Sequence, residues 1–385
     1  MIPLVRDTIN NEDIDKLIEW LKTYPKLTKG KLTTDFEDMW SRFQKRKYST
    51  YVNSGSSANL AMVYAFKLSK RNINKNKRIV VPTLSWVTTV SPVIQLGYDP
   101  ILCEVDKQTL GLDPDYFEML CEKYKPEAAI VTHILGIPCN MKRIMETAEK
   151  YDVVVLEDSC EAVGSTSNGT MTGNFGLMST FSYYFGHHMS TIEGGMVCTD
   201  DKEMDDLLKM IRSHGWSRDL DDEKKEELSL KYKISEFNDM FTFYVPSFNL
   251  RATDLQAFIG IKQIPRLYEN CEKRYQNFKQ YQLQIENDYW KLPYQYDMVS
   301  NFAYPIIHPK RNDIVKRLKE NDIEVRPLVC GSIARQPFYR DLYGLADLKF
   351  GDEVHLHGCY VPNNPELTKE EINKICSIIN MEIKK

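Results

Sequence analysis

The stretch AAIVTHILGIPCNMKRIMETAEKYDVVVLED, residues 128–158, contains the pattern from which the fold can be predicted. Two short apolar runs, 128–133 and 153–158, are rich in β-branched residues, whereas the segment 141–151 carries apolar residues three and four positions apart. Runs of the first kind are typical of buried strands, and the second spacing is typical of an amphipathic helix. This order favours two parallel strands joined by a helical crossover.

The same alternation continues on both sides of this unit. Further strand-like runs occur at residues 48–53, 78–82, 101–105, 179–185 and 195–200. Helix-like segments at 58–67 and 114–122 lie between them. We therefore expect an α/β fold with a mostly parallel sheet and helices on both of its faces.

The C-terminal part of the chain has a different pattern. Long helical stretches cover residues 202–213 and 251–274. Three further segments, 301–309, 312–321 and 323–329, alternate between strand-like and helix-like patterns, and residues 369–383 predict a last helix. We expect a large domain with an N-terminal segment over residues 1–250 and, after a connecting helix, a smaller α+β domain over 251–385.

Composition excludes several classes of protein. The 385 residues include 50 Lys plus Arg and 54 Asp plus Glu, for a net charge of -4, and no basic arm suggests binding to nucleic acid. No apolar run approaches the roughly 18 residues that cross a membrane, and the N-terminus lacks the apolar core of a signal peptide. The nine cysteines form no CxxC pair, which argues against disulfides and structural zinc. We expect a cytoplasmic protein.

One group of residues could suggest a metal site. His355, His357 and Cys359 stand at alternate positions of a strand-like run. Alternate residues of a strand share a face because of the pleat alone, so this spacing does not require a ligand. We predict no metal.

Ligands of an open α/β sheet bind at the carboxyl ends of its strands, so the residues that follow each run are informative. The first run is followed by Ser54, Gly55, Ser56 and Ser57, which lead directly into a predicted helix. Free backbone N–H groups at a helix start, together with hydroxyl groups, favour binding of an anion such as a phosphate. An ordinary serine N-cap is the alternative. The segment has neither the P-loop lysine nor a GxGxxG motif.

Two further runs end in candidate cofactor residues. Trp86 follows the run 78–82 and could offer an aromatic face, although an isolated tryptophan is often a core residue. Asp158 ends the run 153–158. A buried carboxylate keeps its charge most easily beside a cation, and a protonated pyridine nitrogen is such a group. A helix N-cap is the alternative for this aspartate.

The loop after residue 182 contains adjacent histidines, His187 and His188. They could provide a general base or a metal pair, or they could be solvated. Neighbouring side chains diverge, so the pattern favours a base over a metal site.

Taken together, five motifs resemble those of fold-type I pyridoxal phosphate (PLP) enzymes, specifically the sugar aminotransferase family of the DegT and StrS group. The motifs are NSGSSANL, VPTLSWVTT, VVVLEDSCEAVG, FSYYFGHHMSTIEGG and SFNLRATDLQAFIGIKQI. The resemblance extends from about residue 27 to the C-terminus. It implies the aspartate aminotransferase-like fold.

The chain departs from most of this family at one position. His187 stands where the family has the lysine that binds the cofactor covalently, and no Lys or Arg occurs in residues 151–201. Glu161 stands where aminotransferases usually have glutamine. Both features resemble the lysine-less branch of sugar 3-dehydratases, which acts on GDP-linked 4-keto-6-deoxymannose. Cys198 is followed by no cysteine before Cys271, so the iron-sulfur cluster of another branch is not expected.

The resemblance implies a C3-dehydratase that uses pyridoxal and pyridoxamine phosphate without a covalent lysine. L-glutamate would be the amino donor, and ammonia and a 3,6-dideoxy-4-keto sugar would be released, the substrate being a nucleotide-linked hexose or heptose. One alternative is a PLP-dependent nucleotide-sugar aminotransferase with a lysine from elsewhere in the chain. Another is a non-catalytic partner subunit.

The family's functional residues match specific positions here. His187 matches the base, Asp158 the partner of the pyridine nitrogen, Trp86 the residue stacked on the ring, and Glu161 a neighbour of the phenolic oxygen. The matches to phosphate contacts are Gly55, Ser56, Ser57 and Ser182, and Asn249 matches a contact delivered from the other subunit of a homodimer.

Five further residues are candidates for contacts with the substrate or its diphosphate, because arginine pairs with phosphate in bidentate fashion. They are His188, His214, Arg218, Arg251 and Arg326. Surface or interface salt bridges are the alternative for the arginines, and a structural role is the alternative for His188.

Overall fold

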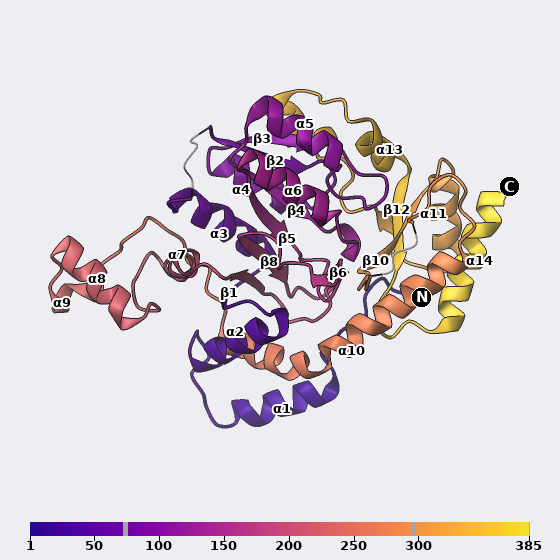
Figure 1. Cartoon of the computed structure of the whole chain (residues 1–385). Helices are drawn as coiled ribbons and strands as arrows, with labels where there is room; N and C mark the ends of the chain where they lie inside the picture. Colours follow the sequence, from indigo (N-terminus) through magenta and orange to yellow (C-terminus); the bar gives the residue numbers. More distant parts are fainter. Residues whose placement is uncertain (72–75, 294–296, 385) are drawn as a thin grey trace.

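The computed structural model describes residues 1–71, 76–293 and 297–384. Its centre is a seven-stranded sheet with the order β1-β9-β8-β5-β4-β2-β3 (Figure 1). The strands are β1 (Tyr48–Val52), β2 (Arg78–Pro82), β3 (Asp99–Cys103), β4 (Ala128–Thr132), β5 (Val154–Asp158), β8 (Met178–Ser182) and β9 (Gly195–Thr199). Only β9 runs against the direction of the others. The prediction of a mostly parallel sheet is confirmed.

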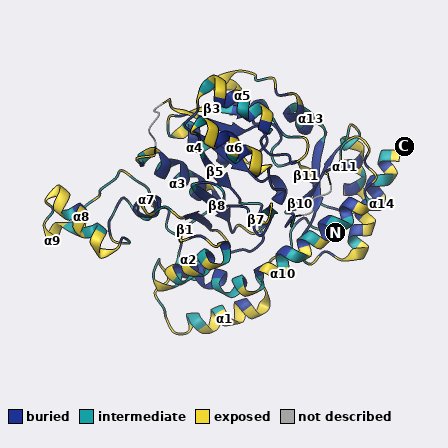
Figure 2. Cartoon of the chain, in the orientation of Figure 1, coloured by how far each residue is buried: buried dark blue, intermediate teal, exposed yellow. Residues whose placement is uncertain are grey.

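Alternation of side chains along the strands explains why helices cover both faces. Ile79 and Val81 of β2 pack in a buried cluster with α3 (Gly55–Leu68), α4 (Val87–Gln95) and α7 (Lys202–Arg212). Val80, between them, packs on the other face with α5 (Pro114–Tyr124) and α6 (Met141–Tyr151). Successive side chains of a strand point to opposite faces, so a run that is apolar at every position is buried on both. Figure 2 shows these strands as the most buried part of the molecule.

One predicted strand is too long. The run 179–185 leaves the sheet after Ser182, where β8 ends. Tyr183 is buried against Trp40 and Tyr51, whereas Tyr184 and Phe185 are exposed. In the sequence, these aromatic residues look like a continuation of the strand, although they lie outside the sheet.

The C-terminal part forms a separate three-stranded antiparallel sheet. Its strands, in the order β10-β12-β11, are β10 (Ala303–Ile307), β12 (Gly358–Pro362) and β11 (Arg326–Pro327). The hydrophobic cluster on this sheet includes residues of α11 (Arg311–Glu320) and α14 (Lys369–Lys384). The N-terminal Ile2 also belongs to this cluster and pairs with Ile323.

A long helix, α10 (Asp254–Gln284), connects the two sheets (Figure 1). It begins with a capping box between Thr253 and Gln256. Its first half packs on α2 (Lys31–Gln44) and α1 (Asn11–Leu21), and its later half packs on α14. The domain division near residue 250 stays a prediction; this helix begins at Asp254.

Several short elements complete the fold. They are the hairpin β6 (Thr166–Ser167) and β7 (Thr170–Met171), the 3-10 helices η1 (Ile134–Gly136) and η2 (Ile333–Arg335), and the helices α12 (Pro337–Tyr343) and α13 (Lys349–His357). Two more helices, α8 (Asp222–Tyr232) and α9 (Glu236–Asp239), form an arm that projects from the body (Figure 1).

The strand-like interpretation of the region around His355 is wrong for both histidines. His355 and His357 lie in the last turn of α13, and only Cys359 lies in a strand, β12. Phe350 and Val354, four positions apart, are buried on one side of this helix and fix it in place. Among the described residues, no group of three His, Cys, Asp or Glu side chains could hold a metal ion. No helix in the described ranges is long and apolar enough to span a bilayer.

Candidate active site

A cavity of about 340 Å³ lies between the carboxyl ends of the large sheet and the small sheet. This volume is within the range of pockets that bind small molecules. The large domain lines it with Ser54, Gly55, Ser56, Asn59, Trp86, Thr88, Thr89, Thr132, Ile134, Asp158, Cys160, Glu161, Ser182, Tyr184, His187 and Glu193. The small domain contributes Phe302, Arg326, Val329 and Tyr360. No lysine occurs among these described lining residues, and Arg326 is the one arginine.

The start of helix α3 forms one end of the cavity. Ser54 is its N-cap, and the Ser54 hydroxyl accepts a hydrogen bond of 3.0 Å from the N–H of Ser57. Ser57 therefore serves the cap and does not line the cavity, whereas Gly55, Ser56 and Ser182 do. A Cβ atom at Gly55 would lie only 2.6 Å from Cβ of Ser182, so glycine permits the close approach of helix and strand. Unpaired N–H groups at this helix start favour an anion.

Asp158 ends strand β5 and is only 4% exposed. One carboxylate oxygen, Oδ2, accepts hydrogen bonds from Asn59 at 2.8 Å and from the Thr89 hydroxyl at 2.7 Å. The other, Oδ1, accepts one from the N–H of Cys160 at 3.2 Å. None of the described Lys, Arg or His side chains forms an ion pair with it. A buried carboxylate without a cation is costly, so a cationic ligand atom would complete this arrangement.

His187 lies in the loop after β8 and on the cavity wall. Its Nδ1 atom is buried and has no hydrogen-bond partner among the described residues. The ring packs against Phe302 with centroids 5.2 Å apart. The pKa of His187 is lowered to about 4, mainly by burial and also by the positive charge of Arg274, against the opposing effects of the Cys160 backbone and Asp158. The imidazole is therefore neutral near pH 7 and can accept a proton.

Glu161 also lies on the cavity wall, and its pKa is shifted. Its Oε2 atom accepts a hydrogen bond of 2.7 Å from the N–H of Leu135. Burial raises the pKa of Glu161 to about 7, and the Asp158 charge contributes, although the Leu135 hydrogen bond opposes the shift. A substantial fraction of Glu161 is therefore protonated at neutral pH and can donate a hydrogen bond.

Trp86 and Arg326 lie on the cavity wall. Trp86 precedes α4 as its N-cap residue, and it remains 57% exposed. An indole ring that the core does not cover can stack on a flat ligand. Arg326 pairs with Glu324 at 2.9 Å and also faces the cavity.

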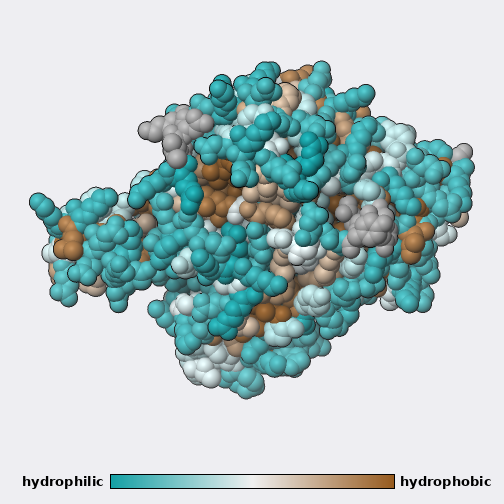
Figure 3. Space-filling model, viewed as in Figure 1, coloured by the Kyte–Doolittle hydropathy of each residue, from teal (hydrophilic) through white to brown (hydrophobic). Residues whose placement is uncertain are grey.

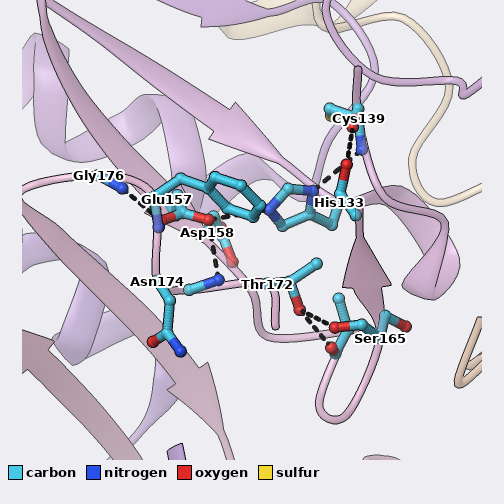
Figure 4. Close-up of polar contacts among 12 residues, drawn as sticks. His133, Cys139, Glu157, Asp158, Ser165, Thr172, Asn174 and Gly176 are labelled. Atoms are coloured by element: carbon cyan, nitrogen blue, oxygen red, sulfur yellow. Dashed lines mark hydrogen bonds and ion pairs between the residues drawn. The ribbon is translucent and has the colours of Figure 1, made fainter. Parts of the chain in front are cut away.

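A buried hydrogen-bond network holds the end of β5 (Figure 4). The sequence did not predict this network. Nδ1 of His133 accepts the N–H of Cys139 at 3.2 Å, so Nε2 donates to Glu157 at 3.2 Å. Glu157 also accepts the N–H groups of Gly173, Phe175 and Gly176 at 2.8, 2.8 and 2.6 Å. Burial raises the pKa of Glu157, but the hydrogen bonds outweigh this effect and hold it below its usual value.

Besides Ser57, five predicted site residues lie outside the cavity. His188 is fully buried, and its Nε2 lies 2.9 Å from the Ser300 carbonyl, so it is part of the core packing. The other four, Asn249, His214, Arg218 and Arg251, gather at the base of the arm around Trp216. The Arg218 guanidinium stacks 3.8 Å from the Trp216 ring centroid. Arg251 donates to Asn249 at 3.0 Å.

Sequence reasoning missed several lining residues. Asn59 and Thr89 hold Asp158, and Thr132 has a buried hydroxyl without a partner among the described residues. Thr132 ends strand β4, and this position is the only signal in the sequence that could have identified it. Tyr360 and Phe302 come from the small domain, and their spacing along the chain gives no indication of this site.

These residues fit pyridoxal phosphate. The start of α3 suits its phosphate, the unpaired charge of Asp158 suits its protonated pyridine nitrogen, and Trp86 offers a flat surface. Two polar atoms on the wall, Nδ1 of His187 and Oγ1 of Thr132, are buried without partners in the described part of the chain. Unpaired buried polar atoms are rare in native proteins and are consistent with a site built around a polar ligand.

Comparison with known sequences identifies relatives of the whole chain. The DegT/DnrJ/EryC1/StrS aminotransferase family matches residues 7–380. GDP-4-keto-6-deoxy-D-mannose 3-dehydratase of Yersinia pseudotuberculosis is 31% identical over 389 residues, which cover 98% of each chain. The protein of the same name from Escherichia coli O55:H7 is 33% identical over 317 residues, 80% of each chain.

Solved structures agree with the sequence relatives. A histidine-to-asparagine mutant of GDP-4-keto-6-deoxymannose-3-dehydratase with bound GDP-perosamine superposes with a TM-score of 0.91 at 28% identity, covering 98% of this chain and 100% of that one. The same enzyme with a trapped PLP-glutamate geminal diamine gives a TM-score of 0.89 at 27% identity, with the same coverage. The expected fold-type I architecture is confirmed. The chain belongs to the DegT/DnrJ/EryC1/StrS aminotransferase family.

Proposed function

We propose that this protein is a PLP-dependent 3-dehydratase that acts on a GDP-linked 4-keto-6-deoxy sugar. The observation that carries this proposal is a neutral histidine, His187, on the wall of a cavity whose described lining residues include no lysine. The relatives named above, which match nearly the whole chain, support the same activity. L-glutamate would supply the amino group, and the products would be its keto acid, ammonia and the 3,6-dideoxy-4-keto sugar.

The cofactor would be held without a covalent bond to lysine. Asp158 would pair with its pyridine nitrogen, the start of α3 with its phosphate, and Trp86 with its ring face. When bound, pyridoxal phosphate supplies an electron sink that stabilises negative charge on the carbon next to its ring, and in its amine form it carries the amino group from glutamate.

His187 would move the protons. Its imidazole is uncharged near neutral pH, so it can take a proton without first losing one. The protonated ring can then give this proton to the C3 hydroxyl as that group departs from the sugar. Glu161, with a pKa of about 7, would donate a hydrogen bond from its protonated carboxyl group. One imidazole acting in both directions suits an elimination reaction.

We propose that the protein acts as a homodimer and that the residues at the base of the arm serve the partner's cavity. Asn249, His214, Arg218 and Arg251 lie together but do not line the cavity of their own chain. Apolar side chains lie on the surface of the arm (Figure 3). Among them is Phe237, which is 82% exposed. A projecting arm with cationic and apolar side chains is suited to closing a neighbouring site that holds a diphosphate.

Mixing two inactive variants tests this arrangement. Arg218→Ala and His187→Asn each remove one half of a composite site. If Arg218 acts on the partner's cavity, subunit exchange creates dimers with one intact site, and activity returns. If Arg218 acts on its own chain, the mixture stays inactive, as does a mixture of His187→Asn with itself.

A product assay tests the main proposal. The protein is reconstituted with pyridoxal phosphate and supplied with L-glutamate and a GDP-4-keto-6-deoxy sugar. A dehydratase releases ammonia and a sugar without its C3 oxygen. An aminotransferase forms an amino sugar, and borohydride would then leave a pyridoxyl-lysine in the peptide map. Failure to form either product, with pathway activity unaffected by His187→Asn, would indicate a non-catalytic partner subunit.

A further inference from the structure

Arg274 of helix α10 is a buried charged residue. It is only 2% exposed, and no carboxylate of the described residues forms an ion pair with it. Its guanidinium instead donates to backbone carbonyl groups. Nη1 contacts the carbonyl oxygens of Phe302 at 2.9 Å, of Asn301 at 3.5 Å and of Asn363, and Nη2 contacts that of His187 at 3.4 Å.

These carbonyl groups belong to segments that are far apart in the sequence. His187 lies in the loop after β8, Phe302 directly precedes β10, and Asn363 directly follows β12. One guanidinium therefore ties the loop that carries His187 to one end of the small sheet, where β10 begins and β12 ends. The same contact fixes the Phe302 ring beside the imidazole, because the Phe302 backbone and the His187 backbone share one donor group.

The network continues to the other acid-base group of the cavity. The Asn301 side chain donates to the Leu135 carbonyl at 2.7 Å, and the Phe302 N–H donates to the same oxygen at 2.9 Å. Leu135 in turn donates its own N–H to Glu161. The segment that Arg274 holds thus connects the backbone at His187 with the carboxyl group of Glu161.

The charge of Arg274 acts on the imidazole as well. Carbonyl dipoles stabilise the guanidinium but leave its net charge in place. The charged and titratable groups that face His187 are Arg274 from α10, Asp158 from the end of β5, and the adjacent His188. Asp158 favours the protonated imidazole, whereas Arg274 and burial oppose it.

We propose that Arg274 is a positioning residue for the base: it fixes the His187 backbone against Phe302 and places a positive charge without a described acidic partner next to the imidazole. This inference rests on the proposed role of His187. An arginine is required because its planar group offers five donors in fixed directions, whereas lysine offers a point charge with three.

Two substitutions separate the charge from the geometry. Arg274→Gln removes the charge and retains an amide donor, and Arg274→Lys retains the charge and loses the planar fork. Lys273→Met is the matched control, because the neighbouring side chain is half exposed and pairs with Glu269 on the outside of the same helix.

The first readout is the titration of His187 in the cofactor-free protein, followed by nuclear magnetic resonance of labelled histidine. His187→Asn assigns the signal among the seven histidines. Removing the charge in Arg274→Gln should raise the titration midpoint of His187 by about one pH unit, while Arg274→Lys and Lys273→Met leave it unchanged. A midpoint that does not move in folded Arg274→Gln overturns the proposal. This readout needs no substrate, so it stands even if the proposed reaction fails.

The second readout is the reaction itself. Loss of the fixed backbone in Arg274→Lys should lower kcat by roughly tenfold and leave KM for the GDP sugar within about twofold, because the defect lies in the orientation of the base. If Arg274→Gln does not fold, Arg274→Lys decides alone. In Arg274→Lys, an unchanged kcat overturns the proposal. In the same variant, a lowered kcat together with an unchanged titration midpoint of His187 supports it.

Discussion

The two sides of strand β5 hold adjacent buried carboxylates with opposite environments. Glu157 accepts hydrogen bonds from His133 and three backbone N–H groups, so its charge is fully satisfied (Figure 4). Asp158 accepts three hydrogen bonds from neutral groups, and no cation of the described residues pairs with it. The satisfied side stabilises the fold, and the side that lacks a partner can bind a cationic ligand atom. Substitutions on the two sides should therefore affect different properties.

The strongest test of the cavity side is His187→Asn. Asparagine cannot exchange a proton near neutral pH, so the dehydration rate should fall by about 10²–10⁴-fold. Because Asp158 and the start of α3 are untouched, cofactor affinity should stay within about threefold of the original value. Product formation and cofactor titration measure the two effects. Equal losses of affinity and rate would mean that His187 holds the cofactor and is not the base.

Asp158→Asn should give the next largest effect. The amide retains the shape, and its oxygen can accept the hydrogen bonds of Asn59 and Thr89, but its NH2 group then faces the N–H of Cys160 and cannot pair with a pyridinium. We expect a loss of kcat of about 10²–10³-fold together with weaker cofactor binding. The free energy of unfolding of the cofactor-free protein should change by about 1 kcal/mol or less, because the lost hydrogen bond from Cys160 is offset by the removal of a charge that no described cation pairs. A large loss of stability would mean that Asp158 is a structural residue like its neighbour.

Glu157→Gln should give the opposite result. In either orientation of the amide, its NH2 group faces two hydrogen-bond donors. Two buried hydrogen bonds are therefore lost. The cofactor-free protein should lose about 2–4 kcal/mol of unfolding free energy, measured by denaturant titration. The kcat of the folded variant at low temperature should stay within about threefold of wild type. A selective loss of kcat would show that the two sides of β5 are not separable.

The comparison also explains what the sequence can and cannot predict. The strands were predictable because they are buried on both faces, which requires continuous apolar runs such as 128–133 and 153–158. Asp158 was predictable because it ends such a run. The different environment of Glu157 was not, since it depends on a turn at residues 173–176 that folds back on the strand.

Long-range contacts set the other limits. The sequence shows two adjacent histidines, and only the packing of Ser300 against His188 separates their roles. Arg274 looks like any helix residue until His187, Phe302 and Asn363 meet around it. The hairpin β6–β7, in contrast, had a local signal in Asn168 and Gly169, both of which adopt positive φ in the turn.

The last effect expected on the cavity side concerns the pH dependence of stability and not the reaction rate. Burial raises the pKa of Glu161 to about 7 in the folded protein. Between the ordinary pKa and this raised value, Glu161 is protonated in the folded protein and ionised in the unfolded chain. The stability that the protonated Glu161 contributes is therefore lost as the pH rises from about 5 to 8. Glu161→Gln, which resembles the protonated form, should abolish this contribution and be more stable than the original protein at pH 8 by up to about 3 kcal/mol, with little difference at pH 5. Denaturant titrations of the cofactor-free protein at both pH values measure it. Parallel stability profiles for the two proteins would mean that Glu161 is already ionised in the cavity, and that its carboxylate accepts hydrogen bonds there and does not donate one.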